Sequence, residues 1–144
     1  MLMYSRYLRG QAYKGEPVML FHKQIMINAK INNAVRTPDQ AIDFLKDLVQ
    51  KIDMKIIQGP YASYVDAEGN RGVTAVVMIE TSHIAFHVWD EKEPGTVQFD
   101  LYTCGALDKQ KVLDAFGEEF EVVSMHYRMY NREVGFVLEE EGSL

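Results

Sequence analysis

The chain has 144 residues, of which 47% are hydrophobic, a formal net charge of −6 at pH 7 and one cysteine. This length suits a single domain, 1–144, while the negative charge excludes a general nucleic-acid-binding surface and the lone cysteine excludes an internal disulfide. No run approaches the roughly 18 apolar residues of a membrane span, and the N-terminus lacks the apolar core of a signal peptide. We therefore expect a cytoplasmic protein that contacts neither nucleic acid nor membrane.

The first predicted strand follows a basic and aromatic segment. Residues 1–17 alternate aromatic and basic side chains, and we expect an N-terminal extension or an edge strand there. From Val18 to Ile31, apolar residues stand mostly at alternate positions, as a strand with one buried face requires. Thr37-Pro38-Asp39-Gln40 is typical of a capping box with proline at the first helical position. An amphipathic helix is expected to follow, with an apolar stripe that includes Ala41, Leu45, Leu48 and Ile52.

The middle of the chain is expected to form four strands joined by short reversals. Their predicted spans are Lys55–Val65, Gly72–Ile79, Ser82–Trp89 and Thr96–Thr103. Gly59-Pro60 should bend or bulge the first of them, because proline cannot donate to a strand ladder. The loop Asp66–Asn70 contains residues that tolerate a tight turn, so it predicts a hairpin.

A second helix and further strands are expected near the C-terminus. Asp108 can cap the helix, and Gly117 suits its C-terminal exit. A long strand is predicted from Phe120 to Met129, and Val134–Leu138 can add another before an acidic tail, Glu139–Glu141, that frays into solvent.

The predicted order of elements indicates an α+β fold. It is a two-layer sandwich in which a mostly antiparallel sheet carries both helices on one face. If the uncovered face is apolar, a second sheet must bury it. We therefore expect a homodimer with αββα layers.

Candidate chemistry gathers between residues 79 and 105, which contain two of the four histidines, the single tryptophan and the single cysteine. His83 and His87 lie on one face of a strand with no evident third ligand, so no metal site is predicted. Ser82 lacks the strand-to-helix elbow of a hydrolase serine. Taken alone, Cys104 is either a buried apolar residue or a working thiol.

The stretch from Ser82 to Glu91, followed by Tyr102-Thr103-Cys104-Gly105, resembles the prokaryotic S-adenosylmethionine decarboxylases. Their pattern runs Glu-Ser-His, three residues, His-x-Trp-Pro-Glu and then Phe-Thr-Cys-Gly. Upstream, Gly72–Val77 is similar to the family's Gly-Val-Ser-Gly-Val-Val. The resemblance implies that the chain cleaves itself between Thr81 and Ser82 and converts Ser82 into a pyruvoyl cofactor, which condenses with a substrate amine and accepts the electrons released with carbon dioxide.

The resemblance also implies roles for other side chains. Thr74 matches the hydroxyl residue that assists processing, and His87 matches the histidine that helps remove the serine α-proton. Cys104 matches the acid that reprotonates the product carbon. Glu91 matches the glutamate that holds the ribose hydroxyls of the substrate, and Tyr61 is the candidate for stacking on its adenine.

The sequence departs from the family pattern near the expected cleavage point. Thr81 stands where the family usually has Glu, Asp90 replaces a proline, and two extra residues separate His87 from Cys104. Because a regular strand places residues five apart on opposite faces, Ser82 and His87 should not share a face. The roles implied for Ser82 and His87 nevertheless require both to reach one site. We therefore expect a bulge between them, or Ser82 lying just before the strand proper.

Three functions remain open at this stage. The first is a self-processing pyruvoyl-dependent decarboxylase of S-adenosylmethionine, which supplies the aminopropyl donor for spermidine synthesis. The second is a pyruvoyl-dependent decarboxylase of another amino acid, such as arginine or ornithine. The third is an unprocessed, non-catalytic relative that acts as a binding or regulatory partner.

Overall fold

The computed structural model describes Gly15 and residues 20–144. The expectation for residues 1–17 and the predicted start of the first strand at Val18 therefore lie outside the described residues, apart from Gly15. Seven strands and two helices follow in nearly the expected order: β1 (Lys23–Asn32), α1 (Pro38–Lys51), β2 (Ile56–Val65), β3 (Gly72–Ile79), β4 (Ser82–Trp89), β5 (Gly95–Thr103), α2 (Lys109–Glu119), β6 (Glu121–Asn131) and β7 (Val137–Ser143).

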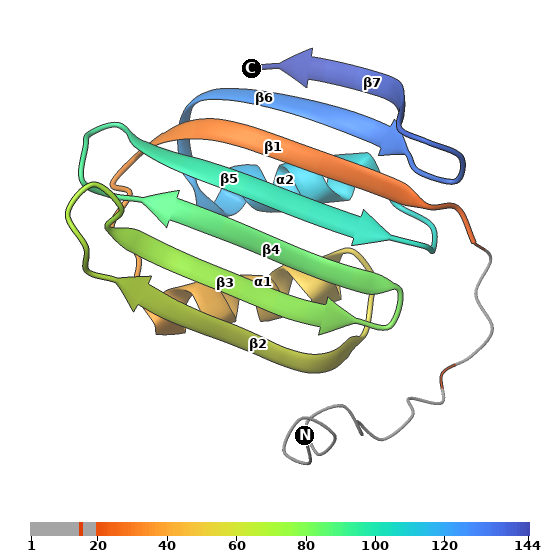
Figure 1. Ribbon diagram of the computed structural model, residues 1–144, viewed down its shortest axis with the longest axis horizontal. Coiled ribbons are helices and arrows are strands. Elements are labelled where there is room, and N and C mark those ends of the chain that lie inside the picture. The colour runs from red at the N-terminus through yellow and green to blue at the C-terminus, as the bar shows by residue number, and fades with distance from the viewer. Residues whose placement is uncertain (1–14, 16–19) are drawn as a thin grey trace, which may run out of the picture.

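The strands form one antiparallel sheet in the order β2-β3-β4-β5-β1-β6-β7. Strand β1 lies between β5 and β6, although both follow it by more than sixty residues. Figure 1 shows both helices behind the same face of the sheet. This arrangement confirms the predicted α+β sandwich of one sheet and two helices. Neither helix in residues 20–144 has the length and hydrophobicity needed to cross a membrane.

One hydrophobic core fills the space between the sheet and the helices. Strand β4 shows how the sequence builds it, since Ile84, Phe86 and Val88 are buried while the residues between them are partly exposed. The ring of Phe86 meets the ring of Phe44 from α1 edge-on, with centroids 5.3 Å apart. Phe120 closes the cluster, because its centroid lies 5.2 Å from that of Phe44.

Replacing Phe86 by alanine is expected to lower the free energy of unfolding by about 3–5 kcal/mol, because it leaves a cavity where the side chain is 1% exposed. Urea denaturation followed by circular dichroism measures this loss. Phe136→Ala is the matched control, since it removes the same side chain from a position that is 74% exposed and should cost less than about 1 kcal/mol. Equal losses in the two variants would contradict the described core.

The helix starts agree with the capping predictions, but one helix end does not. Thr37 caps α1: its hydroxyl accepts a hydrogen bond from the Gln40 N–H at 3.2 Å, and the Gln40 side chain accepts one from the Thr37 N–H at 3.0 Å. Asp108 caps α2 as predicted. The predicted exit at Gly117 is wrong, because α2 continues to Glu119. Continuing the helix brings Phe120 into the core, where it is 3% exposed.

The predicted fraying of Glu139–Glu141 is also wrong. These residues belong to β7, which pairs with β6. Lys23 donates a hydrogen bond to Glu139, and this contact lowers the pKa of the Glu139 carboxyl. Lys109 does the same for Glu140 and lowers its pKa. The cations come from β1 and α2, so only the fold brings them to the acidic strand.

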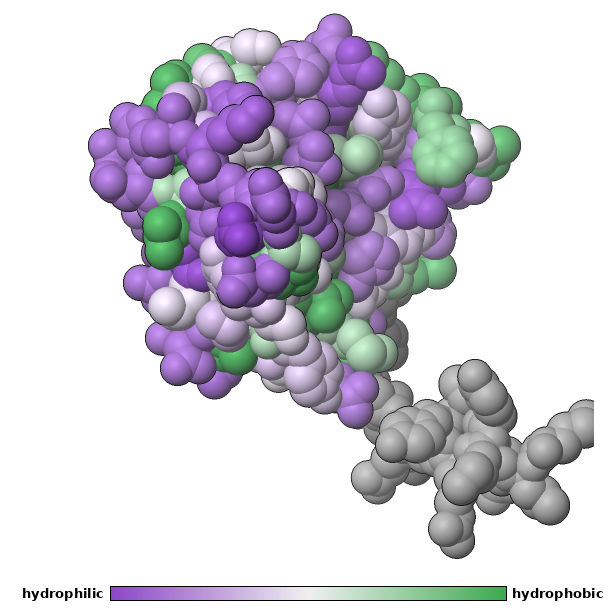
Figure 2. Space-filling view, turned by 60° about the vertical axis from the view of Figure 1, so that its left-hand side comes forward, coloured by the Kyte–Doolittle hydropathy of each residue, from purple (hydrophilic) through white to green (hydrophobic). Residues whose placement is uncertain are grey.

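The sheet face away from the helices, called the open face below, carries a mixture of polar and apolar side chains. Figure 2, in which the left-hand side of Figure 1 comes forward, shows scattered green patches on a largely hydrophilic surface and presents the open face only obliquely. Apolar members of the open face include Met26, Val76 and Met78, each 39–47% exposed, while Asn28 and its cross-strand neighbours Gln98 and His126 are polar. The open face therefore mixes apolar with polar side chains, and the expected dimer, which depended on an apolar face, stays a prediction.

Candidate active site

The predicted cleavage point lies at the tip of the β3–β4 hairpin, at the right of Figure 1. Glu80 and Thr81 form the turn, and Ser82 is the first residue of β4, paired with Ile79 on one side and Thr103 on the other. The φ angle of Ser82 is 147°. Residues with a side chain rarely adopt positive φ, and such strain concentrates at functional sites. The backbone is thus strained at the serine expected to react.

The carbonyl expected to be attacked is held by the end of β5. The Cys104 N–H donates a hydrogen bond of 2.8 Å to the Thr81 carbonyl oxygen. A donor in this position polarises the carbonyl and stabilises the negative charge that develops on its oxygen during nucleophilic attack. Cys104 is partly buried, and its own carbonyl accepts the N–H of Phe21 at 2.8 Å. The structure therefore brings Thr81, Ser82 and Cys104 together, and we call these three residues the cleavage end.

A second group of predicted residues lies near the other end of β4. The Thr74 hydroxyl and His87 Nδ1 are 3.0 Å apart across the β3–β4 pairing. The His87 ring stands beside the Trp89 ring, with centroids 5.7 Å apart, and the Trp89 indole N–H donates to the Asn70 side chain at 2.8 Å. These side chains line a small hollow of about 130 Å³.

Glu91 lies at the same end, in the loop after β4. Its carboxylate accepts the Gly69 N–H at 2.9 Å and lies 3.1 Å from the Arg71 guanidinium, so it is oriented by the β2–β3 hairpin. Tyr61 is 58% exposed on β2 and pairs with Val76 of β3. We call Thr74, His87 and Glu91 the histidine end.

The substitution of Asp90 for the family's proline adds contacts to this loop. The Asp90 N–H, which a proline would lack, donates to the Arg71 carbonyl at 3.1 Å. The Tyr64 hydroxyl donates to the Asp90 carboxylate at 2.9 Å, and this bond raises the pKa of Tyr64. The β4–β5 pairing runs without a shift from Ser82 to Trp89, so the two extra residues are accommodated in the loop.

The two ends of β4 are far apart within one chain. Both pairings of β4 are regular from Ser82 to Trp89, so the predicted bulge is wrong. At about 3.3 Å per residue, five residues separate Ser82 from His87 by roughly 17 Å. The alternative expectation is met in part, because Ser82 is the first residue of the strand and has a φ angle that regular strands do not adopt. Within one protomer, His87 and Ser82 do not meet.

Sequence reasoning missed Thr103 as a site residue. Its hydroxyl donates to the Thr81 hydroxyl at 2.7 Å and accepts the Gly105 N–H at 3.0 Å. The side chain is fully buried. Thr103 belongs to the Tyr-Thr-Cys-Gly motif, which was the signal available in the sequence. The sequence did not show which residue the Thr103 hydroxyl contacts.

Polar side chains on the open face lie next to the cleavage end. The Asp100 carboxylate is 3.5 Å from His83 Nε2 and accepts a hydrogen bond of 2.5 Å from Gln24. His83 pairs with Tyr102 across β4 and β5, and their ring centroids are 5.9 Å apart. Within residues 20–144, no group of three or more His, Cys, Asp or Glu side chains is placed to hold a metal ion.

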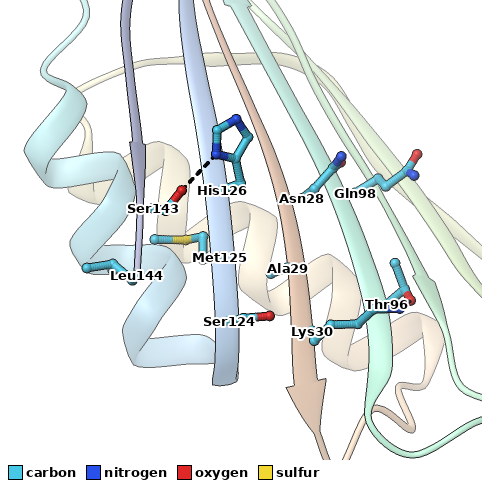
Figure 3. Close-up of a pocket in the computed structure, with 10 residues that line it drawn as sticks. All are labelled: Asn28, Ala29, Lys30, Thr96, Gln98, Ser124, Met125, His126, Ser143 and Leu144. Carbon is cyan, nitrogen blue, oxygen red and sulfur yellow. Dashed lines mark hydrogen bonds between the residues drawn. The ribbon is translucent and has the colours of Figure 1, made fainter.

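A separate hollow of about 440 Å³ lies on the β1–β6 side of the open face. Figure 3 shows polar side chains from neighbouring strands around it, and the His126 ring is hydrogen-bonded to the Ser143 hydroxyl at 2.9 Å. None of the residues predicted for catalysis lines this hollow. This hollow therefore gives no support to the residues predicted for catalysis, which lie elsewhere in the fold.

Comparison with known proteins identifies the family. Residues 24–133 match the family described as S-adenosylmethionine decarboxylase. The chain belongs to the S-adenosylmethionine decarboxylase family. This finding confirms the resemblance drawn from the motifs.

Two curated relatives carry the same name, S-adenosylmethionine decarboxylase proenzyme. The one from Pyrococcus furiosus is 37% identical over 83 residues, which cover 57% of this chain and 55% of the relative. The one from Archaeoglobus fulgidus is 29% identical over 89 residues, which cover 61% of this chain and 74% of the relative. The match thus spans about half the length of the first relative.

A solved structure of a phage SAM lyase in complex with S-methyl-5′-thioadenosine aligns over 92% of this chain and 95% of its own, with 13% sequence identity and a TM-score of 0.38. A likeness at that score supports no statement about this chain. The assignment to the family depends on the sequence match instead.

Proposed function

We propose that this chain is the precursor of a pyruvoyl-dependent decarboxylase, which cuts itself between Thr81 and Ser82 and acts on S-adenosylmethionine. The observation that carries the proposal is the 2.8 Å hydrogen bond from the Cys104 N–H to the Thr81 carbonyl oxygen, directly beside the strained Ser82. An electrophile, its activating donor and an adjacent hydroxyl nucleophile are the parts that an acyl shift requires.

The proposed self-cleavage balances with water as the one added reactant. The Ser82 hydroxyl oxygen attacks the Thr81 carbonyl carbon, and the peptide C–N bond breaks as the acyl group moves from nitrogen to oxygen. Removal of the Ser82 α-proton then expels the Thr81 carboxylate and leaves a double bond between the α- and β-carbons. After tautomerisation to the imine, water adds and ammonia leaves, which gives a pyruvoyl group on the nitrogen of His83. Both the cofactor and its attachment therefore come from this chain.

The fit of the pyruvoyl group is supported by the residues around its source. When formed, the group supplies an electron sink for the pair released with carbon dioxide. Cys104 follows the strand residue that pairs with Ser82, and this proximity in the sheet supports the proposal that its thiol returns a proton to the product carbon. This is the role that family membership suggests for Cys104.

We further propose that two chains complete each site. His87 has no route to Ser82 within one protomer, whereas Thr74 and His87 project from the open face. A two-fold dimer that packs open face on open face with β4 strands reversed places the histidine end of one chain opposite the cleavage end of the other. Such a dimer has αββα layers. In it, the partner's His87 would remove the Ser82 α-proton.

S-adenosylmethionine is the proposed substrate because the family and both curated relatives are named for it. The product would then serve as an aminopropyl donor for spermidine synthesis. Release of labelled carbon dioxide from S-adenosylmethionine, arginine and ornithine, each supplied alone to the cleaved protein, compares the candidate substrates. A higher rate on arginine or ornithine would overturn the proposed substrate and leave the self-cleavage proposal intact.

Intact mass under denaturing conditions tests the self-cleavage. We expect an N-terminal fragment of 81 residues and a C-terminal fragment of the remaining 63 residues. The C-terminal fragment should be lighter, by the mass of one ammonia, than the same fragment beginning with serine. A single species near 16.5 kDa that persists on long incubation would overturn the proposal and favour the non-catalytic alternative.

A further inference from the structure

We infer that Thr103 is a positioning residue for self-cleavage and that it acts through the hydroxyl of Thr81. This inference rests on the proposed function, since it concerns the rate at which the Thr81–Ser82 bond rearranges. It assigns a task to the pair Thr81 and Thr103, in which Thr81 stands where the family pattern usually has Glu.

The hydrogen bonds of the Thr103 hydroxyl direct its single hydrogen toward Thr81. It accepts the Gly105 N–H at 3.0 Å, and its own hydrogen is donated to the Thr81 hydroxyl oxygen at 2.7 Å. Thr103 is 0% exposed, and among residues 20–144 it is the one polar residue that is buried. Because water does not reach it, no solvent molecule competes for the bond to Thr81.

The same three-residue stretch also holds the carbonyl of Thr81. Between Thr103 and Gly105, the Cys104 N–H donates to that carbonyl oxygen at 2.8 Å. Gly105 also packs closely on Thr81, since a Cβ atom at position 105 would lie 3.0 Å from the Thr81 methyl group. The side chain and the carbonyl of Thr81 are therefore anchored to one short segment.

This anchoring limits how the Thr81–Ser82 peptide unit can rotate. Nucleophilic attack requires the Ser82 oxygen to approach the Thr81 carbonyl carbon along a narrow range of directions, and fixing the two groups in advance removes part of the entropic barrier. A threonine hydroxyl at position 81 is short enough to meet Thr103 Oγ1 while the carbonyl stays on Cys104. The Thr81–Thr103 pair thus orients the electrophile.

The test measures the first-order rate of fragment appearance after cell-free synthesis of the full chain. Thr103→Val keeps the side-chain shape and removes the hydroxyl, and we expect cleavage to slow by about three- to tenfold. Thr103→Ser should restore a rate close to that of the native chain. Thr96→Val on the same strand, whose hydroxyl contacts Lys30 instead, is the matched control and should leave the rate unchanged.

A double-variant comparison separates positioning from simple destabilisation. Thr81→Val removes the same hydroxyl bond and leaves the contact between Gly105 and Thr103, so it should slow cleavage by a similar factor even if Thr103→Val folds poorly. The double variant should be no slower than Thr103→Val, because that single variant already lacks the bond to Thr81. Multiplying effects would overturn the inference.

The outcomes distinguish this inference from the proposed function. If the native chain is not cleaved at all, the proposed function fails and this inference fails with it. If the native chain is cleaved and both valine variants are cleaved at the native rate, only the positioning role is overturned. Thermal unfolding of the valine variants in a Ser82→Ala background checks that each remains folded at the assay temperature.

Discussion

Replacement of Ser82 by alanine is expected to leave the chain as a single species near 16.5 kDa under every condition in which the native chain is cut. Alanine has no oxygen to attack the Thr81 carbonyl, so neither the ester nor the pyruvoyl group can form. Decarboxylation should be lost as well, because no ordinary side chain supplies the electron sink. Denaturing mass spectrometry and carbon dioxide release measure the two losses.

Two controls make this result specific to the serine at the hairpin tip. Ser124→Ala removes a hydroxyl from an exposed position on β6 and should leave cleavage unchanged. Ser82→Cys retains a nucleophile at the same position, so it should still form the acyl intermediate. If Ser82→Ala were cut at the same bond, cleavage would have to come from another protein, and the role of Ser82 would be rejected.

Mixing two inactive variants is expected to restore cleavage in one of them. Ser82→Ala lacks the nucleophile, and His87→Ala lacks the base, for which we expect a slowing of about 10²-fold or more. In a mixed dimer, the chain that carries His87→Ala still has Ser82, and its site receives His87 from the partner. That chain should be cut while the Ser82→Ala chain stays whole. Tags of different mass on the two chains identify which one is cleaved.

The same mixture decides between a site within one chain and a site shared by two chains. If His87 acted on Ser82 of its own chain, neither variant would be cut in the mixture, because each chain would lack one of its own groups. Analytical ultracentrifugation of the mixture checks that dimers form. A dimer in which neither chain is cut would overturn the shared site, and so would a chain that cleaves fully as a monomer.

The features that the sequence predicted are those set by neighbouring residues. Alternating apolar residues predicted the strand that ends near Ile31, because one buried face imposes a period of two on any strand. The Thr37 capping box predicted the start of α1, since the cap and its partner are three residues apart. The cleavage motif was equally local, because Thr81 and Ser82 adjoin and Cys104 follows the strand that pairs with Ser82.

Other features depended on where distant strands pair. The acidic segment Glu139–Glu141 was predicted to fray because its cations Lys23 and Lys109 lie 116 and 31 residues away in the sequence. The end of α2 was misplaced at Gly117, since the burial of Phe120 against α1 outweighs the local preference of glycine for a helix terminus. In both cases, tertiary contacts overrode a correct local tendency.

The candidate residues of the site came from the sequence, but their geometry did not. The sequence alone proposed the serine, the cysteine and the histidine, because the motif keeps them in one short stretch. Only the tertiary structure decided that β4 is regular, which separates Ser82 from His87 by nearly the length of the strand, and that Thr103 meets Thr81. Register and side-chain direction follow from the pairing of β4 with β3 and β5, and that pairing is a property of the whole sheet.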